Sequence, residues 1–380
     1  MRKVIAVLKK ELMLTLSLLA AVVSLFITPP SAALLRDIDW KTLGILFMML
    51  TVLEGFKKES IFTPLVRLAG KIPTMVGLSL FLVFSVFFSS MFVTNDVSLI
   101  IFVPLTILLF RAGDKEKYIL PVISMENIAA VRGSMLTPFG SPQNIFLFSR
   151  SGVSAGRFLL HMLPLNLFSG VLLVIFILVL YRRDRKETIG LNEEKTGEDW
   201  LPERKTQRIG YLVLFALVVW TIVSRTSLWP YVTVLLAVSV FFIDRSLYRR
   251  VDYVLLLTFL CFFVFSSSIA ANPGISGFLR HSVAGAEYWW GILLSQLISN
   301  VPAAIVLWPF TDNLSGLLYG VDTAGLCSLI GSLASVINYR IYVREYPGRG
   351  GKFIKTFTLV SWAFFAIVVL PGYFLSRWSF

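Results

Sequence analysis

The sequence predicts an all-α polytopic membrane protein, with about nine full spans and two re-entrant helical hairpins in two inverted-topology repeats with broken helices. Hydrophobic residues make up 56% of the 380 residues, and the mean hydropathy of +0.78 is far above that of a soluble domain. Several apolar windows exceed the roughly 18 uncharged residues that mark a membrane span. Backbone groups in lipid must be paired within a segment or a closed barrel, so these segments are expected to be helices.

The first half of the chain is expected to begin with a separate amino-terminal helix, residues 1–30, whose basic start stays in the cytoplasm. The first repeat is expected over residues 31–181. Its elements are a span over 43–56, a surface segment over 57–71, a polar-tipped hairpin over 75–110, an interrupted helix over 118–148 and a span over 158–181.

The second half is expected to repeat this plan. Residues 182–208 are dense in both charge signs and are interpreted as a cytoplasmic linker. The second repeat is expected over residues 209–380. Its elements are spans over 211–223, 231–243 and 253–269, a polar-tipped hairpin over 288–310, an interrupted helix over 320–343 and a last span over 357–375.

Two short polar stretches interrupt apolar runs and predict the hairpin tips. Thr94-Asn95-Asp96 lies inside the run over 75–110, and Ser299-Asn300 lies inside the run over 288–310. Polar side chains at membrane depth are costly to bury unless something needs them. The second run has 23 residues, whereas crossing twice takes about 40. It is therefore expected to turn back within the membrane, and its partner likewise.

Three landmarks recur in the same order in the two halves. The pairs Asp39-Trp40 and Asp252-Tyr253 open helices. Each tip asparagine is followed by a proline nine residues later, and the stretch 137–141 matches the stretch 328–332. Internal duplication is common in transporters, so these matches predict two repeats.

The basic residues predict the orientation of the chain. Of the 35 Lys and Arg, 27 fall in segments that are cytoplasmic when the amino terminus is inside, seven fall outside, and Arg132 alone lies at membrane depth. This asymmetry requires each hairpin to enter and leave on one side, so the repeats are inverted and the carboxyl terminus is outside. Because the net charge of +13 lies in loops beside spans, nucleic acid is not expected as a partner.

The expected substrate and ion site lies where the helices break. Broken helices free backbone groups and present partial charges to a ligand. Hydroxyl, amide and carbonyl oxygens suit a hard cation such as sodium, and helix amino termini suit an anion. The predicted binding residues are Thr94, Asn95, Asp96, Arg132, Thr137, Gly140, Ser141, Asn144, Ser299, Asn300, Ser328, Gly331 and Ser332.

The stretches 92–100, 133–144 and 299–303 resemble signature segments of the ion transporter superfamily. That group includes citrate-transporter-like proteins, arsenite permeases, NhaD-type sodium/proton antiporters and divalent-anion/sodium symporters. The resemblance implies a secondary active transporter that works by alternating access. It further implies that Asn95 and Gly140 in one repeat, and Asn300 and Gly331 in the other, are sodium ligands.

The chain departs from the symporter pattern at the residue after each tip asparagine. Asp96 and Val301 stand where the symporters have a hydroxyl residue. A fixed carboxylate repels a dianion unless it is protonated or paired, and Arg132 is its expected partner. Asp96 therefore favours the alternative of an arsenite efflux permease or a sodium/proton antiporter on the same fold.

Simpler interpretations compete with these roles. The tip asparagines could serve only as helix caps, Gly140 and Gly331 as packing glycines, and Arg132 as a side chain that reaches the surface. An enzyme or scaffold is not expected, since no nucleophile–base pair, metal cluster or nucleotide loop is evident. The expected partners are a small inorganic or organic anion and the lipid bilayer of the inner membrane, with sodium or a proton as the coupling ion and no other cofactor. The sequence is also compatible with a homodimer.

Overall fold

The computed structural model describes residues 11–29, 32–59, 61, 68–69, 71–184, 187–189 and 205–380. In these ranges the regular structure is helical apart from one isolated bridge between Thr74 and Thr188. Seven of the helices in the described part of the chain are long and apolar enough to cross a membrane. The protein is therefore an all-α polytopic membrane protein. The expected basic start 1–10, most of the linker, and residues 62–67 of the surface segment lie outside the described residues.

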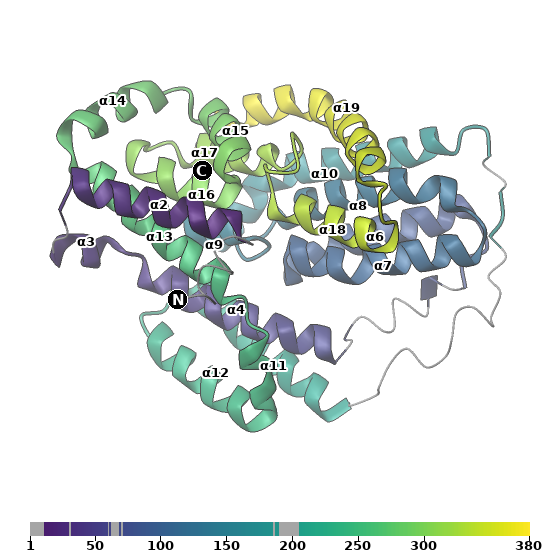
Figure 1. Ribbon diagram of the computed structural model, residues 1–380, viewed down its shortest axis with the longest axis horizontal. Helices are drawn as coiled ribbons and strands as arrows, with labels where there is room; N and C mark the ends of the chain where they lie inside the picture. The colour runs from purple at the N-terminus through teal and green to yellow at the C-terminus, as the bar shows by residue number, and fades with distance from the viewer. Residues whose placement is uncertain are drawn as a thin grey trace.

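The elements follow one another along the chain as Figure 1 shows. They are α2 (Leu12–Ile27), α3 (Ala32–Asp37), α4 (Trp40–Lys58), α6 (Met75–Val93), α7 (Asn95–Ala112), η1 (Glu116–Tyr118), α8 (Ile119–Ser134), α9 (Pro142–Arg150), α10 (Ala155–Leu180), α11 (Lys205–Ser224), α12 (Trp229–Asp244), η4 (Arg245–Arg249), α13 (Tyr253–Ala271), α14 (Pro273–Val283), α15 (Glu287–Ile298), α16 (Asn300–Leu307), η5 (Trp308–Phe310), α17 (Leu314–Ala324), α18 (Leu333–Glu345) and α19 (Gly350–Ser376).

The helices form two packed groups (Figure 1). In the first group α11 and α12 pack on α4, and α2 lies along α13. In the second group α6 packs on α8 and α15 packs on α17, while α10 and α19 lie beside them. The groups meet where α13 lies along α16 and where α4 touches α7 and α9.

Two helices begin at the aspartates that the sequence marked as starts. The Asp39 carboxylate caps α4 by accepting from Thr42 N at 3.0 Å. The Asp252 carboxylate caps α13 in the same way, by accepting from Leu255 N at 2.9 Å. Such caps satisfy backbone donors that have no partner inside the helix.

Two long helices fix the depth at which the broken helices end. α10 has 26 residues, about 39 Å of helix, and Asn166 near its middle donates to Arg132 O at 2.7 Å. α19 has 27 residues, and Trp362 near its middle donates to Cys327 O at 2.6 Å. Arg132 lies near the end of α8, and Cys327 follows the end of α17. Both breaks therefore lie deep between the two ends of the spanning helices.

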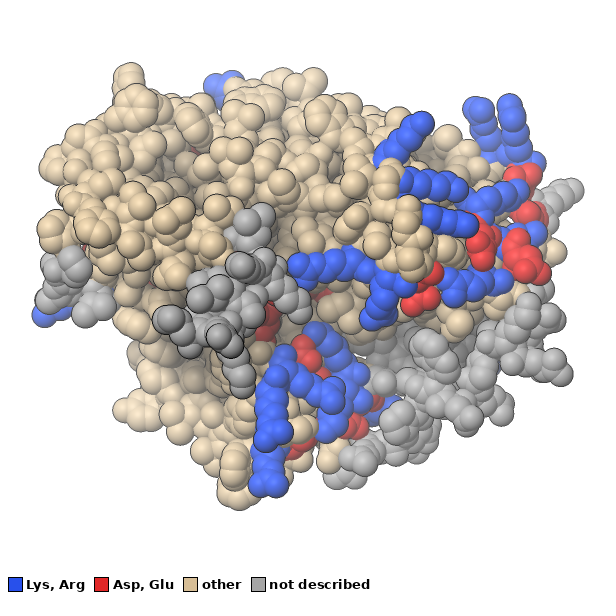
Figure 2. All heavy atoms as spheres, viewed as in Figure 1, with Lys and Arg blue, Asp and Glu red and all other residues tan. Residues whose placement is uncertain are grey.

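Charged side chains gather into two separate sets. One set pairs Lys58 with Asp244, Arg111 with Glu345, Lys115 with Glu187 and Lys117 with Asp184. The other pairs Arg150 with Asp39, and brings Lys41 to Arg225 O. Each of these contacts joins two residues that are expected on the same side of the membrane. Figure 2 shows charges crowded over the right and lower middle of one face, and few at the left.

Candidate functional site

The two hairpin tips have the same unusual backbone conformation. Thr94 is the single residue between α6 and α7, with φ 71° and ψ 155°. Ser299 is the single residue between α15 and α16, with φ 71° and ψ 159°. Glycine is almost the only residue that adopts this combination of φ and ψ, and for any other residue the conformation costs of order 1–3 kcal/mol. Such strain persists where the surrounding structure imposes it, which is typical of functional sites.

Each broken helix folds back so tightly that only a glycine fits. A Cβ at Gly140 would lie 2.2 Å from Ser134 O, the end of α8. A Cβ at Gly331 would lie 2.5 Å from Ala324 O, the end of α17. The two loops, residues 135–141 and 325–332, therefore use a glycine in the same way. Close backbone packing, and not flexibility alone, explains the residue type at both positions.

Side chains brace the first loop from within. The Asn144 amide nitrogen Nδ2 donates to the carbonyl oxygens of Ser134, Met135 and Thr137 at 3.2, 3.3 and 3.1 Å. Ser141 Oγ caps α9 by accepting from Asn144 N at 3.4 Å. These contacts give Asn144 and Ser141 a structural task in holding the break.

The second loop is held by different atoms. Ser328 Oγ donates to Gln296 Oε1 at 2.7 Å and accepts from Gly331 N at 3.2 Å. Gln296 Nε2 in turn donates to Ala324 O at 3.2 Å. Ser332 precedes α18 and makes no side-chain cap. Sequence reasoning missed Gln296, although a glutamine in an apolar hairpin arm is itself a signal.

Each tip is tied to the loop of its own half. The Thr137 hydroxyl donates to Met91 O, three residues before the first tip. In the second half Asn300 N donates to Gly331 O at 3.2 Å. The predicted ligands Asn300 and Gly331 are thus in direct contact. Asn95 instead uses its own Oδ1 to accept from Asp96 N at 2.9 Å.

A cavity of about 380 Å³ runs from the first tip to one of the charged sets. At its inner end it is lined by residues at the starts of three helices: Thr94 and Asp96 of the α7 start, Pro142 of α9 and Leu333 of α18. At its other end it is lined by Glu54, Lys57, Arg250 and Asp252. Leu333 lies two residues from Gly331, so the cavity connects the first tip with the loop that holds the second.

Two of the helix starts at this cavity, those of α7 and α18, have no side-chain cap from the preceding residue, whereas Ser141 caps α9. Thr94 at α7 and Ser332 at α18 make no side-chain cap, and neither does Ser299 at α16. The first N–H groups of a helix have no partner inside the helix and carry its positive partial charge. Two such ends at the cavity, those of α7 and α18, make it suited to an anion.

The expected pair between Asp96 and Arg132 is not formed. Arg132 is fully buried, which excludes a side chain that reaches the surface. Its guanidinium donates to Asp322 O at 2.7 Å and approaches Met135 Sδ at 3.3 Å. Asp96 instead lies half-buried on the cavity wall. Arg132 points from α8 toward α17, because packing of the two breaks brings these helices together.

Asp322 is the buried carboxylate that sequence reasoning missed. It lies on α17, one turn before the second break, and is 1% exposed. Its Oδ1 accepts from Gln143 Nε2 at 2.9 Å, while Oδ2 has no donor among the described residues. A lone carboxylate in the apolar run over 320–343 was a usable signal. Arg132, Gln143 and Asp322 together join the two broken helices.

The chain matches the citrate transporter family over residues 4–331. It belongs to that family. An inner membrane protein of Escherichia coli K12, YbiR, is 30% identical over 311 residues, which is 80% of each chain. An uncharacterized transporter of Methanocaldococcus jannaschii is 30% identical over 307 residues, covering 80% of this chain and 81% of the relative. A 46 kDa membrane protein of Mycobacterium leprae is 22% identical over 346 residues, covering 80% of this chain and 79% of that one.

Family membership confirms the resemblance found in the signature segments. Together with the apolar helices, it identifies the protein as a multi-pass membrane transporter that acts on a small molecule.

Proposed function

We propose that the protein is a secondary active transporter of a small anion, oxyanion or carboxylate, coupled to sodium or protons and working by alternating access. The observation that carries this proposal is the cavity beside the first tip, onto which the starts of α7, α9 and α18 open. Its volume, about 380 Å³, lies within the range of sites for small ligands. The amino termini of α7 and α18, which lack side-chain caps, supply attraction for a carboxylate group without a fixed countercharge.

Inverted repeats over residues 31–181 and 209–380 are part of the proposal. Corresponding helices share their packing: α6 on α8 parallels α15 on α17, and α7 on α18 parallels α16 on α9. The identical strained tips support the same correspondence. In each repeat the tip and its loop would form one ion site, with Asn95 and Gly140 as sodium ligands in the first and Asn300 and Gly331 in the second.

The cavity opens toward the side richer in basic residues, which we assign to the cytoplasm of an inner membrane. Lys57 and Arg250 line its mouth. With this orientation the amino terminus is cytoplasmic and the carboxyl terminus is outside. The structure then corresponds to an inward-facing state, in which bound solute exchanges with the cytoplasm.

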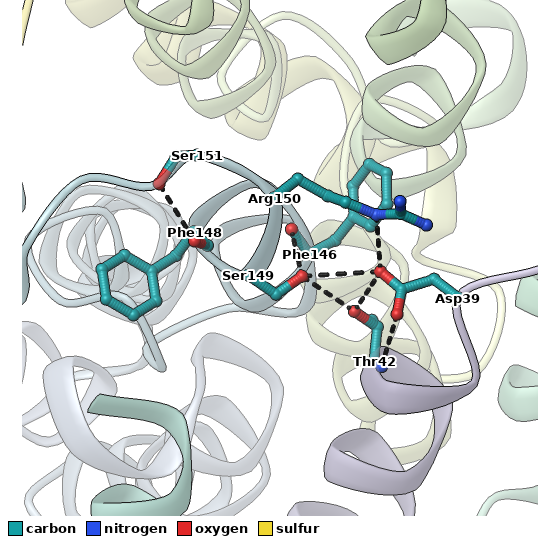
Figure 3. A network of polar contacts seen from close by, with 7 residues as sticks. All are labelled: Asp39, Thr42, Phe146, Phe148, Ser149, Arg150 and Ser151. Carbon is teal, nitrogen blue, oxygen red and sulfur yellow. Dashed lines mark hydrogen bonds and ion pairs between the residues drawn. The ribbon is translucent and has the colours of Figure 1, made fainter. Parts of the chain in front are cut away.

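A polar network joins the start of α4 to the end of α9 (Figure 3). The Asp39 carboxylate at the start of α4 accepts from Arg150 Nε at 3.0 Å and from the Thr42 hydroxyl at 2.8 Å. Thr42 Oγ1 also lies 3.1 Å from Ser149 Oγ at the end of α9. Nearby, Arg225 donates to Phe148 O at 2.7 Å. These contacts fasten the α4 group to the broken helix, and an outward-facing state would have to release them.

A second candidate on the same fold is arsenite efflux or sodium/proton antiport. The position of Asp96 on the cavity wall favours it, because a carboxylate there would repel a multivalent anion when ionised. Lys57 and Arg250 on the same wall offset part of that charge. An Asp96 that takes up a proton with the substrate reconciles the carboxylate with anion transport.

Uptake by proteoliposomes tests the proposal. The purified protein is reconstituted and offered radiolabelled citrate, succinate, phosphate and arsenite under an imposed sodium or proton gradient. The proposal expects gradient-driven accumulation of at least one anion, reduced by Asn95→Ala and unchanged by Gly277→Ala, a substitution with no neighbour within 4 Å. Sodium/proton exchange without anion uptake would favour the second candidate. No gradient dependence for any of these solutes would refute both.

A further inference from the structure

We propose that Glu126 is a proton-carrying site of this transporter, separate from the substrate cavity. This inference rests on the proposed function, and it names the coupling ion as a proton. Glu126 lies on α8 and is fully buried. Its Oε1 accepts from the Thr106 hydroxyl of α7, and its Oε2 has no donor among the described residues.

The surroundings of Glu126 hold a carboxylic acid far better than a carboxylate. No ion pair of Glu126 is found in the described part of the chain, and one neutral hydroxyl is its hydrogen-bond donor. A buried, unpaired carboxylate in a membrane interior is strongly disfavoured over its neutral form. In this conformation Glu126 therefore holds a proton.

The seam between α8 and α18, which begins at the residue next to Glu126, is also short of donors. The neighbouring residue Asn127 donates its Nδ2 to Ser335 Oγ of α18 at 3.1 Å, and Asn338 Nδ2 donates to Ile123 O at 2.7 Å. The oxygens Oδ1 of Asn127 and Asn338 are buried with no donor among the described residues. Glu126 therefore lies beside a contact between the two halves in which buried acceptors lack donors.

Among the described residues, no hydrogen bond or ion pair joins Glu126 to a titratable group on the helices packed against α8. These groups are Asp96 and Arg111 on α7, Arg157 and His161 on α10, Arg340, Arg344, Glu345, Tyr339 and Tyr342 on α18, Lys352, Lys355 and Tyr373 on α19, Glu116, Lys117 and Tyr118 of η1, and Arg132 on α8 itself; α6 has none.

The position of the seam links proton binding to both the solvent and the substrate. A cavity of about 250 Å³ at the basic end of α8 is lined by Leu120 and Tyr342. Glu126 lies six residues deeper than Leu120 along α8, about 9 Å of helix. On the other side of the seam, Ile337 of α18 lines the substrate cavity. Release of the proton would place a charge between α8 and α7, and α7 packs on α18 of the second half, so that the packing of the two halves would be disturbed.

The variant Glu126→Gln separates a proton carrier from a structural residue. The amide keeps the size of the side chain and its contact with Thr106, and it mimics a permanently protonated acid. Loaded carrier can still reorient, so exchange of labelled for unlabelled anion should stay within about twofold of the unmodified protein. Net uptake driven by a pH gradient requires the empty carrier to return without the proton, so it should fall by about tenfold or more.

Glu287→Gln is the matched control. Glu287 is also a buried glutamate, 5% exposed, but its oxygens accept from Gly285 N, Thr311 and Asn313. Loss of these structural contacts should change exchange and net uptake together. If Glu126→Gln keeps pH-driven net uptake, or loses exchange and net uptake alike in a folded protein, the proposal is overturned.

Infrared spectroscopy gives a readout that does not depend on transport. The purified protein near neutral pH should show a carboxylic acid C=O band that is missing in Glu126→Gln and present in Glu287→Gln. An unchanged band in Glu126→Gln would overturn the proposal even if no solute is transported. Uptake driven by sodium alone would likewise reject a proton at Glu126, while leaving the proposed transporter intact.

Discussion

The strained conformation of the hairpin tips predicts an inversion of the usual order between alanine and glycine. At an ordinary helix position alanine is more stable than glycine by about 1 kcal/mol. At Thr94 the backbone has φ 71° and ψ 155°, a region that costs a residue with a Cβ about 1–3 kcal/mol. Thr94→Ala and Thr94→Gly both remove the hydroxyl and methyl groups, so their difference isolates this backbone term.

Glycine recovers the strain but adds about 0.4–1 kcal/mol of freedom to the unfolded chain. The net expectation is that Thr94→Gly is more stable than Thr94→Ala by about 1.3 kcal/mol, the difference between the midpoints of the two terms. Ser299, with φ 71° and ψ 159°, should behave alike. Thr51, inside α4, is the control position and should keep the usual order.

Unfolding of the purified variants in mixed micelles, titrated with a denaturing detergent and followed by tryptophan fluorescence, measures the difference. If the alanine variants at both tips are as stable as the glycine variants, or more stable, the claim that the backbone is strained at the tips is refuted. Both substitutions at Thr94 remove the hydroxyl at the cavity, so each should also slow transport.

Three further predictions follow from named contacts. Asp96→Asn should abolish proton-linked uptake but leave sodium-linked uptake partly intact in proteoliposomes; unaffected rates would remove Asp96 from the mechanism. Asp39→Asn weakens the network of Asp39 with Thr42 and Arg150, and should raise the labelling by an impermeant maleimide of cysteines introduced on the outer side. Asp252 also caps a helix but belongs to no such network, so Asp252→Asn should leave this labelling unchanged. A hydrogen bond from Lys115 holds the pKa of Glu187 below its ordinary value. This contact therefore stabilises the folded protein above about pH 4 and is lost as pH falls through the lowered pKa. Lys115→Ala should shift that loss to higher pH, so that on acidification proteolysis of the segment around Glu187 begins at a higher pH. An unchanged pH profile of proteolysis would contradict the direction given for the pKa of Glu187.

The breaks in the helices could be predicted because each leaves a local mark. Polar residues inside apolar runs located the tips at Thr94 and Ser299, and the Gly-Ser pairs located the loops at Gly140 and Gly331. The physical reason is the same in each case: buried polar groups and missing Cβ atoms in a membrane segment are costly unless the backbone departs from a helix there.

The partners of buried charges could not be predicted in the same way. Arg132 was assigned to Asp96, thirty-six residues away, but lies against Asp322 on the other half of the chain. Pairing across 190 residues depends on how the two breaks pack, and no spacing along the sequence encodes it. The short helix α14, in contrast, was missed although Asn272 and Pro273 give an ordinary start signal.

A cryo-electron microscopy map of the protein in lipid nanodiscs, with a transported anion at saturating concentration, tests the shared site most directly. We expect anion density at the starts of α7, α9 and α18, within reach of Thr94 and Leu333. Density confined to the outer cavity lined by Arg280 and Arg377, or tips held apart at the two membrane surfaces, would contradict a common binding site between the hairpins.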